Sequence, residues 1–322
     1  MLQNLKLKQT SRQTVSAKCF VLIFALNLVI ASSTGIAQTV LFDFGRHDNT
    51  HGSTITGALP VNGVTVGSAT AIGDTVSYTW NSIGTGTNNQ VLGNPTYSGF
   101  KDQAGGSVGW SIGSIQQSWT QANGFQNGGL SSAGTLNTRK DPSFSLLGKY
   151  AVANVTGDYW FVDNTLGTTG PASRAGFTIS GLNPSLSYTF NLFGSRHNTS
   201  ARYTHYFLEG SNRGYGLLQT SGQNIGSGDA GSIAGNPDTG KYDGNDANIL
   251  TISGVNPTSA GNISLAFFGT STSASLANDP NANGNSFGYL NFMEVTAVPE
   301  PSGFSLLAAG LIGLWATHRR RA

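Results

Sequence analysis

Apolar and polar residues alternate along several segments of this chain, and this alternation constrains the fold more than any other feature. In residues 186–193, Leu186, Tyr188, Phe190 and Leu192 fall on one side and the residues between them on the other. A period of two residues is that of a β-strand with one buried face. The same pattern predicts strands in residues 39–44, 75–80, 158–162, 175–180, 203–209, 249–253, 262–268 and 289–296.

Turn sequences separate the predicted strands. Ser-Gly-Leu-Asn-Pro at 180–184 and Ser-Gly-Val-Asn-Pro at 253–257 each lie between two of them, and we interpret the pair as the same turn used twice. The chain has 44 glycines and 10% charged residues, against roughly 25% in an average soluble protein. We therefore expect an all-β fold, an antiparallel β-sandwich of jelly-roll type, over residues 38–297.

The positive charges are concentrated at the two ends of the chain. Removing the seven cations of residues 1–37 and 319–321, and Glu300, from the 17 basic and 15 acidic residues leaves 10 bases and 14 acids between them. A nucleic-acid partner requires a basic face. The central region is acidic on balance, so we expect no nucleic-acid partner.

The N-terminal segment has the three parts of a secretory signal peptide. Four basic residues precede an apolar run at 19–31, and small residues, Gly35 and Ala37, stand at positions −3 and −1 of a cleavage site. The alternative is a retained anchor, but a spanning helix needs roughly 20 apolar residues. We expect export by the Sec machinery and cleavage by signal peptidase between Ala37 and Gln38, which also removes the single cysteine, Cys19.

The C-terminal 25 residues, 298–322, form a second targeting segment. Pro299 and Pro301 flank Glu300, and prolines donate no backbone hydrogen bond, so we expect the last strand to end by Ala297. An apolar stretch at 304–317 predicts a short transmembrane helix. Arginines, which tend to stay on the cytoplasmic side of a membrane, close the chain: Arg319, Arg320 and Arg321.

This tail resembles the PEP-CTERM sorting signal. The resemblance is carried by Val298-Pro299-Glu300-Pro301-Ser302, the apolar helix and the terminal arginines. It implies processing by an exosortase, a membrane cysteine protease, in bacteria that make extracellular polysaccharide. The expected location is transiently the inner membrane, then the cell surface or extracellular matrix. An ordinary tail anchor is the alternative.

The central region more loosely resembles galactose-binding and malectin-like jelly-roll modules. The sequences that carry this are LFDFG at 41–45, YTFNLFGSR at 188–196, RYTHYFLEG at 202–210 and GYLNFMEV at 288–295. The resemblance implies a sandwich whose first and last strands lie near one another. It does not identify a ligand.

The sequence contains no assembled motif of a known enzyme class. H-E-x-x-H, P-loop and C-x-x-C patterns do not occur. G-x-S-x-G occurs at 105–109 and 109–113, but no helix is expected after either match, so neither forms the strand-to-helix elbow of a nucleophilic serine. Aspartates could form a two-carboxylate glycosidase site, but their scattered positions identify no pair. We therefore expect a protein that is not an enzyme and has no cofactor.

Three candidate metal sites remain as alternatives to plain loops. Asp279, Asn281 and Asn283 copy the first half of an EF-hand-type calcium loop, although Leu290 stands where the bidentate glutamate should be. We favour an Asn/Gly turn at this position and at the acidic loop 243–246. The histidines of loop 47–51 are likewise expected to be solvated rather than metal ligands.

Arg196, His197, Arg202 and Tyr203 form the best candidate for a ligand site. We expect their two strands to pair as one hairpin, which would gather forked donors and a flat ring at one end of a sheet, as sugar and carboxylate sites do. The alternative, which we favour, is that Tyr203 and the outward arginines pair with nearby aspartates and cover the sheet.

These observations together predict an exported envelope or matrix protein. We expect it to be structural or adhesive and associated with exopolysaccharide in a biofilm matrix. A carbohydrate-binding module with a defined glycan pocket is the first alternative, and a glycan-active hydrolase is the second.

Overall fold

The structure is a computed structural model that describes residues 37–46, 63–85, 96–113, 123–130, 140–165, 174–227, 240–277 and 284–299. Residues 38–298 form one compact unit. The predicted signal peptide, apart from Ala37, the predicted helix 304–317 and the terminal arginines lie outside the described residues. In the part that is described, no helix has the length and apolar character needed to cross a membrane.

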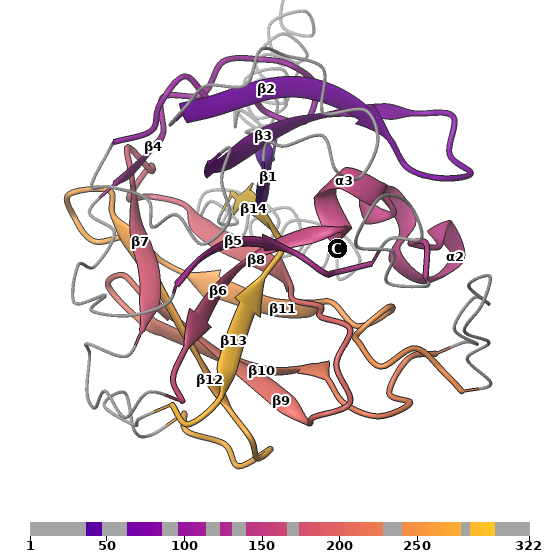
Figure 1. Cartoon of the computed structure of the whole chain (residues 1–322). Helices are drawn as coiled ribbons and strands as arrows, with labels where there is room; N and C mark the ends of the chain where they lie inside the picture. The colour runs from indigo at the N-terminus through magenta and orange to yellow at the C-terminus, as the bar shows by residue number, and fades with distance from the viewer. Residues whose placement is uncertain are drawn as a thin grey trace, which may run out of the picture. The chain divides into compact units, whose positions relative to one another are not determined.

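The described part of the chain is mostly β-structure, arranged in three sheets (Figure 1). The largest sheet has six strands in the order β11-β8-β14-β1-β3-β2. Its strands are β1 (Thr39–Arg46), β2 (Gly63–Thr70), β3 (Ser77–Thr85), β8 (Ser187–Phe193), β11 (Leu250–Val255) and β14 (Phe292–Val298).

The second sheet has five strands in the order β10-β9-β12-β7-β4. Its strands are β4 (Ser111–Gly113), β7 (Ala175–Ser180), β9 (Arg202–Glu209), β10 (Arg213–Ser221) and β12 (Ile263–Thr270).

A third, three-stranded sheet has the order β13-β6-β5. It consists of β5 (Asn123–Asn127), β6 (Asp158–Asp163) and β13 (Phe287–Leu290). Three short helical turns precede β6: α2 (Phe144–Leu147), η1 (Gly148–Tyr150) and α3 (Ala153–Thr156).

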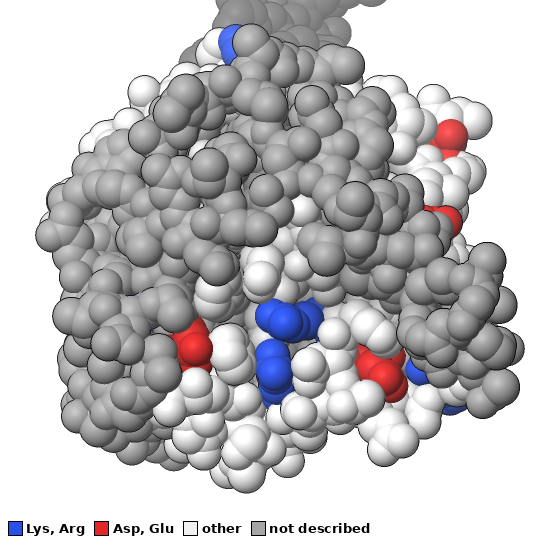
Figure 2. Space-filling model, viewed as in Figure 1, with Lys and Arg blue, Asp and Glu red and all other residues white. Residues whose placement is uncertain are grey.

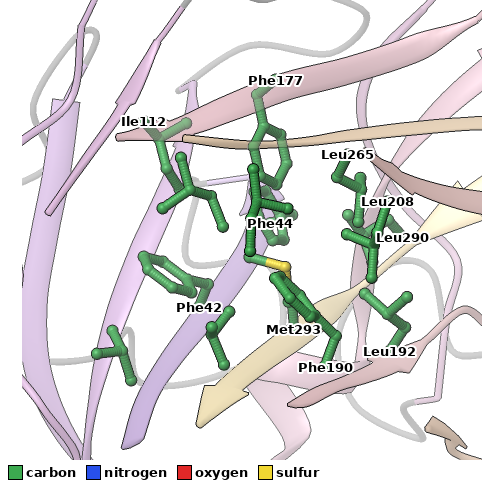
Figure 3. Packing of buried hydrophobic residues seen from close by; sticks show 14 of the residues in the cluster. Phe42, Phe44, Ile112, Phe177, Phe190, Leu192, Leu208, Leu265, Leu290 and Met293 are labelled. Atoms are coloured by element: carbon green, nitrogen blue, oxygen red, sulfur yellow. The ribbon is translucent and has the colours of Figure 1, made fainter. Parts of the chain in front are cut away.

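The two larger sheets face each other across one core, as in a sandwich. Strand alternation places Phe42 and Phe44 of β1 on the same side as Phe190 and Leu192 of β8, and these side chains meet residues of the five-stranded sheet such as Phe177. Figure 3 shows Phe44 directed at Phe177, and the two rings are stacked with centroids 5.4 Å apart. The prediction of an all-β fold is therefore confirmed.

The first and last strands of the domain are neighbours, as expected. β1 and β14 pair antiparallel, from Thr39 opposite Thr296 to Asp43 opposite Phe292. One pairing departs from the expected antiparallel arrangement, because β1 and β3 run parallel. β2 pairs antiparallel with β3 on the other side, so β3 lies between β1 and β2 in the sheet.

The three-stranded sheet joins the sandwich through one of its faces. Trp160 of β6, Phe125 of β5 and Leu290 of β13 belong to the main core. The Trp160 ring lies 5.2 Å from Phe267 and is stacked on Phe44 and Phe177 at 6.0 Å. The opposite face of this sheet is consequently left to form a separate cluster.

The segment 289–296, expected to be one strand, is two strands that belong to different sheets. β13 ends at Leu290, and β14 begins at Phe292. Asn291 between them accepts a hydrogen bond from Ser195 N (2.8 Å) with its side-chain oxygen and donates one from Nδ2 to the carbonyl of Thr156 (3.0 Å). These bonds satisfy the polar groups at the point where the chain changes sheets.

Candidate functional site

Arg196 and Arg202 lie in and just after the connection between β8 and β9. The expectation that their strands form one hairpin is wrong, because β8 is in the six-stranded sheet and β9 in the five-stranded sheet. The connection crosses from one sheet to the other. It brings both arginines to the three-stranded sheet instead of to one end of a hairpin.

The face of the three-stranded sheet that points away from the main core is aromatic. On β6, Tyr159 and Phe161 point away from the main core, while Trp160 and Val162 point into it. Phe287 and Tyr289 of β13 join the two outer β6 residues in one cluster. The tyrosine rings meet edge to face with centroids 4.9 Å apart.

Both guanidinium groups lie over this aromatic cluster. The Arg196 guanidinium carbon is 5.7 Å from the Tyr159 ring centroid and 5.8 Å from that of Tyr289. The Arg202 guanidinium carbon is 4.4 Å from the Phe287 centroid and 5.8 Å from that of Tyr289. These distances are within the range of cation–π attraction.

Hydrogen bonds fix the two arginines further. Arg196 Nη1 donates to the Tyr159 hydroxyl (2.8 Å) and to Gln126 Oε1 (3.4 Å), and Arg202 Nη1 donates to the Tyr289 hydroxyl. Gln126 also accepts a bond from the Tyr159 hydroxyl (3.2 Å). The donors and acceptors thus form one network, with Tyr289 between the two cations.

The electrostatics of the network leave it positively charged. Burial raises the pKa of the Tyr159 and Tyr289 hydroxyls above the ordinary value, so both tyrosines stay neutral. Among the residues that the structure describes, no carboxylate forms an ion pair with Arg196 or Arg202. Figure 2 shows cationic atoms near the centre of the face, in the region of β13, separated from the acidic ones by uncharged atoms.

His197 and Tyr203 are not part of this network. The His197 ring stacks on Tyr242 with centroids 5.4 Å apart. Tyr203 follows Arg202 on β9 and therefore points to the opposite face of the five-stranded sheet. Of the four candidate ligand residues, the structure brings together the two arginines.

The partners of the arginines were not among the candidates from the sequence. Tyr159 and Tyr289 are fully buried, and Gln126 is partly buried. The sequence of β6, Asp-Tyr-Trp-Phe-Val-Asp, contains a signal that could have indicated their burial. Large side chains at consecutive positions indicate a strand that is covered on both faces.

The carboxylates of the acidic loop 243–246 bind partners within the domain. Asp243 Oδ1 accepts a bond from Asn224 N (2.6 Å), and Asp246 Oδ1 accepts bonds from the backbone N (2.8 Å) and hydroxyl (2.9 Å) of Ser227. Lys140 forms an ion pair with Asp246 at 3.7 Å. Within the described ranges, no three His, Cys, Asp or Glu side chains are grouped as metal ligands would be. Asp279, Asn281, Asn283 and the loop 47–51 lie outside those ranges.

The sorting residues begin where the last strand ends. β14 ends at Val298, one residue later than expected, and Pro299 follows. Glu300, Pro301 and the three arginines lie outside the described residues. The first residues of the domain lie next to its last strand. The carbonyl of Gln38, which follows the expected cleavage site after Ala37, accepts a hydrogen bond from Ala297 N (2.8 Å).

Comparison with protein families identifies the C-terminal segment. Residues 297–321 match the PEP-CTERM protein-sorting motif. No curated protein matches the chain. The motif confirms the resemblance stated from the sequence, and it indicates an extracellular protein that is sorted by an exosortase.

Proposed function

We propose that this exosortase-sorted protein is a structural or adhesive element of the envelope matrix, associated with exopolysaccharide and without catalytic activity. The sorting motif at residues 297–321 is the observation that carries the proposal. The chain is exported by the Sec machinery, loses residues 1–37 to signal peptidase and is held in the inner membrane by residues 304–317. An exosortase then removes the tail and passes the domain to the cell surface.

The position of the motif supports this order of events. β14 is an interior strand that pairs with β1 on one side and β8 on the other. Pro299 follows its last residue directly, and its backbone has no N–H to donate. A cut beyond Val298 therefore leaves every strand of the six-stranded sheet in place.

The buried carboxylates support a role that is not catalytic. Asp43 accepts a bond from the Ser82 hydroxyl (2.7 Å) and is buried, and Glu294 forms an ion pair with Lys149 and accepts a bond from Asn191 (3.0 Å). A two-carboxylate hydrolase needs both groups at the substrate. Oδ2 of Asp43 and both carboxylate oxygens of Glu294 are directed at partners within the fold.

The sorting step is tested by substitutions in the motif. Pro299→Ala with Pro301→Ala should leave export intact but stop removal of the tail, so that the chain stays in the membrane fraction. Replacing Arg319, Arg320 and Arg321 with glutamine should let the tail pass through the membrane and release uncut chain, because the charges that retain it are gone. Pro184→Ala, in an exposed turn of the domain, is the control and should be processed normally.

The test uses an exosortase-bearing host and compares the size and fraction of each chain. Wild-type processing of both motif variants would overturn the sorting proposal. A glycan array and a hydrolysis screen on the secreted chain then address the role: binding without turnover supports the matrix role, and turnover would show a hydrolase.

A glycan-binding module with a defined site is the second candidate. The two arginines and the partly exposed ring of Phe287 beside Arg202 favour it, since sugars are bound in proteins by flat apolar surfaces and forked donors. It differs from the first candidate in predicting selectivity for one type of saccharide.

A further inference from the structure

We propose that Arg196 and Arg202 form a binding site for the carboxylate group of an acidic saccharide, such as a uronic acid residue of a polysaccharide. The inference deepens the association with exopolysaccharide proposed above and rests on it. It names the charged group that is recognised and the two side chains that recognise it.

The charge balance of the cluster is the first argument. Two guanidinium groups share one tyrosine, Tyr289, and both are partly buried. Buried cations are ordinarily paired with an anion, because burial removes the water that would otherwise stabilise them. Within the described part of the chain neither Arg196 nor Arg202 has a carboxylate partner, whereas Arg213 of β10 forms an ion pair with Glu209 of β9 at 2.9 Å. An external anion would supply the missing partner.

The arrangement of donors is the second argument. The bonds given above hold Arg196 and Arg202 through Nη1. A guanidinium has five N–H donors in a planar fork, so each arginine keeps donors that these bonds do not use. Each guanidinium carbon lies 5.8 Å from the Tyr289 ring centroid, so forked donors from two different segments are held at one ring, and such donors suit the two oxygens of a carboxylate.

The surroundings favour a saccharide over a free inorganic anion. Phe287 is partly exposed at the edge of the aromatic cluster and lies beside the Arg202 guanidinium. An apolar ring beside a cation matches a uronate, which has C–H faces as well as a carboxylate. Gln126, at the other side of the network, has an amide that can bond to a hydroxyl. Figure 2 shows that cationic atoms in this region reach the surface.

The test measures binding of the full-length chain, purified in detergent, to two forms of one oligosaccharide. The probes are an oligogalacturonate and the same oligomer with its carboxyl groups methyl-esterified. We expect calorimetry to detect the acid form and affinity for the ester to be at least tenfold weaker. Binding of the acid should also weaken as salt is raised. Inorganic sulfate and phosphate are measured in parallel as small anions.

Substitutions assign the binding to the two arginines. Arg196→Gln and Arg202→Gln should each reduce affinity for the acid form at least tenfold and leave the weak binding of the ester unchanged. Arg213→Gln, which removes an exposed arginine that has a carboxylate partner, should have no effect. Circular dichroism checks that each variant is folded. If one does not fold, the comparison of acid and ester on the wild-type chain still decides whether a carboxylate is recognised.

The outcomes separate this inference from the function on which it rests. Equal affinity for acid and ester, or arginine variants that bind as wild type, would overturn the site. Sulfate bound as tightly as the oligogalacturonate would also overturn it, since the saccharide would then contribute nothing. In any of these cases normal processing of the tail would leave the sorting proposal standing.

Discussion

The hydroxyl of Ser82 on β3 donates a hydrogen bond to the carboxylate of Asp43 on β1, with the two oxygens 2.7 Å apart and both residues buried. Burial raises the pKa of Asp43 from 3.8 to about 7, although the bond from Ser82 opposes the shift. An aspartate with a raised pKa binds a proton in the folded state at a pH where the unfolded chain has lost it. Its contribution to stability therefore falls as the pH rises from about 4 to about 7.

Asp43→Asn should remove this dependence. The amide keeps an oxygen for Ser82 but carries no charge, so the variant should be more stable than wild type at pH 8, by up to about 4 kcal/mol for a shift of this size. Urea unfolding at pH 5 and pH 8 measures the difference. Asp74→Asn, in a turn at the surface, is the control. An Asp43→Asn variant less stable than wild type at pH 8 would show that the carboxylate is stabilising.

His205 should produce the opposite dependence at lower pH. Its two ring nitrogens lie 2.9 Å from the Tyr215 hydroxyl and 2.8 Å from Thr270 Oγ1, and the ring stacks on Phe268. Burial lowers its pKa from 6.5 to about 4. The unfolded chain binds the proton first, so this contribution to stability is complete above about pH 6.5 and is lost as the pH falls towards 4.

His205→Phe separates this titration from the packing of the ring. The variant should keep the stacking but lose two hydrogen bonds, at a cost of about 1–3 kcal/mol at pH 7. Since phenylalanine does not titrate, the gap between variant and wild type should narrow as the pH falls from 6.5 to 4. Thermal unfolding followed across this range checks the prediction, and a constant gap would contradict it.

Gly269 should tolerate no side chain. A Cβ at this position would lie 2.0 Å from the carbonyl carbon of Phe287, where β12 and β13 approach each other. Gly269→Ala should thus destabilise the domain by more than about 2 kcal/mol, because backbone atoms must move apart. Gly109→Ala, with nothing within 4 Å of the added Cβ, should have little effect. Equal urea midpoints for the two variants would contradict this reading.

The N-terminus of the exported chain should be Gln38. The small residues Gly35 and Ala37 after the apolar run favour a cut at that position. Intact mass and N-terminal sequencing of protein recovered from cells test this. A chain that begins at Met1 would show that the segment is retained as an anchor.

The alternation of residues predicted several strands well, because one-sided burial leaves a signal in the sequence. β8 is the clearest case, with Tyr188, Phe190 and Leu192 buried as expected. β10 was missed, since Gly214 and Gly216 interrupt its apolar pattern. The structure shows the reason: a Cβ at either position would collide with Ile252 or Leu250 of β11.

The candidate site formed by Arg196, Arg202 and the tyrosines beneath them could be predicted only in part. The sequence singled out Arg196 and Arg202 as residue types suited to a sugar or carboxylate. It could not show that their strands belong to different sheets, because alternation reports which face is buried and not which strand is adjacent. The tyrosines of β6 and β13 are distant in sequence from both arginines, so their contact depends on the whole topology.

Ala297 N and the Gln38 carbonyl are hydrogen-bonded at 2.8 Å, so the chain enters and leaves the domain at one pole. Cleavage after Ala37 and beyond Val298, as proposed, would therefore leave the two new ends of the domain close to each other. A tag or a partner domain fused at either end would therefore be displayed at the same place, and joining the two ends by a short linker should give a circular chain with the native strand order.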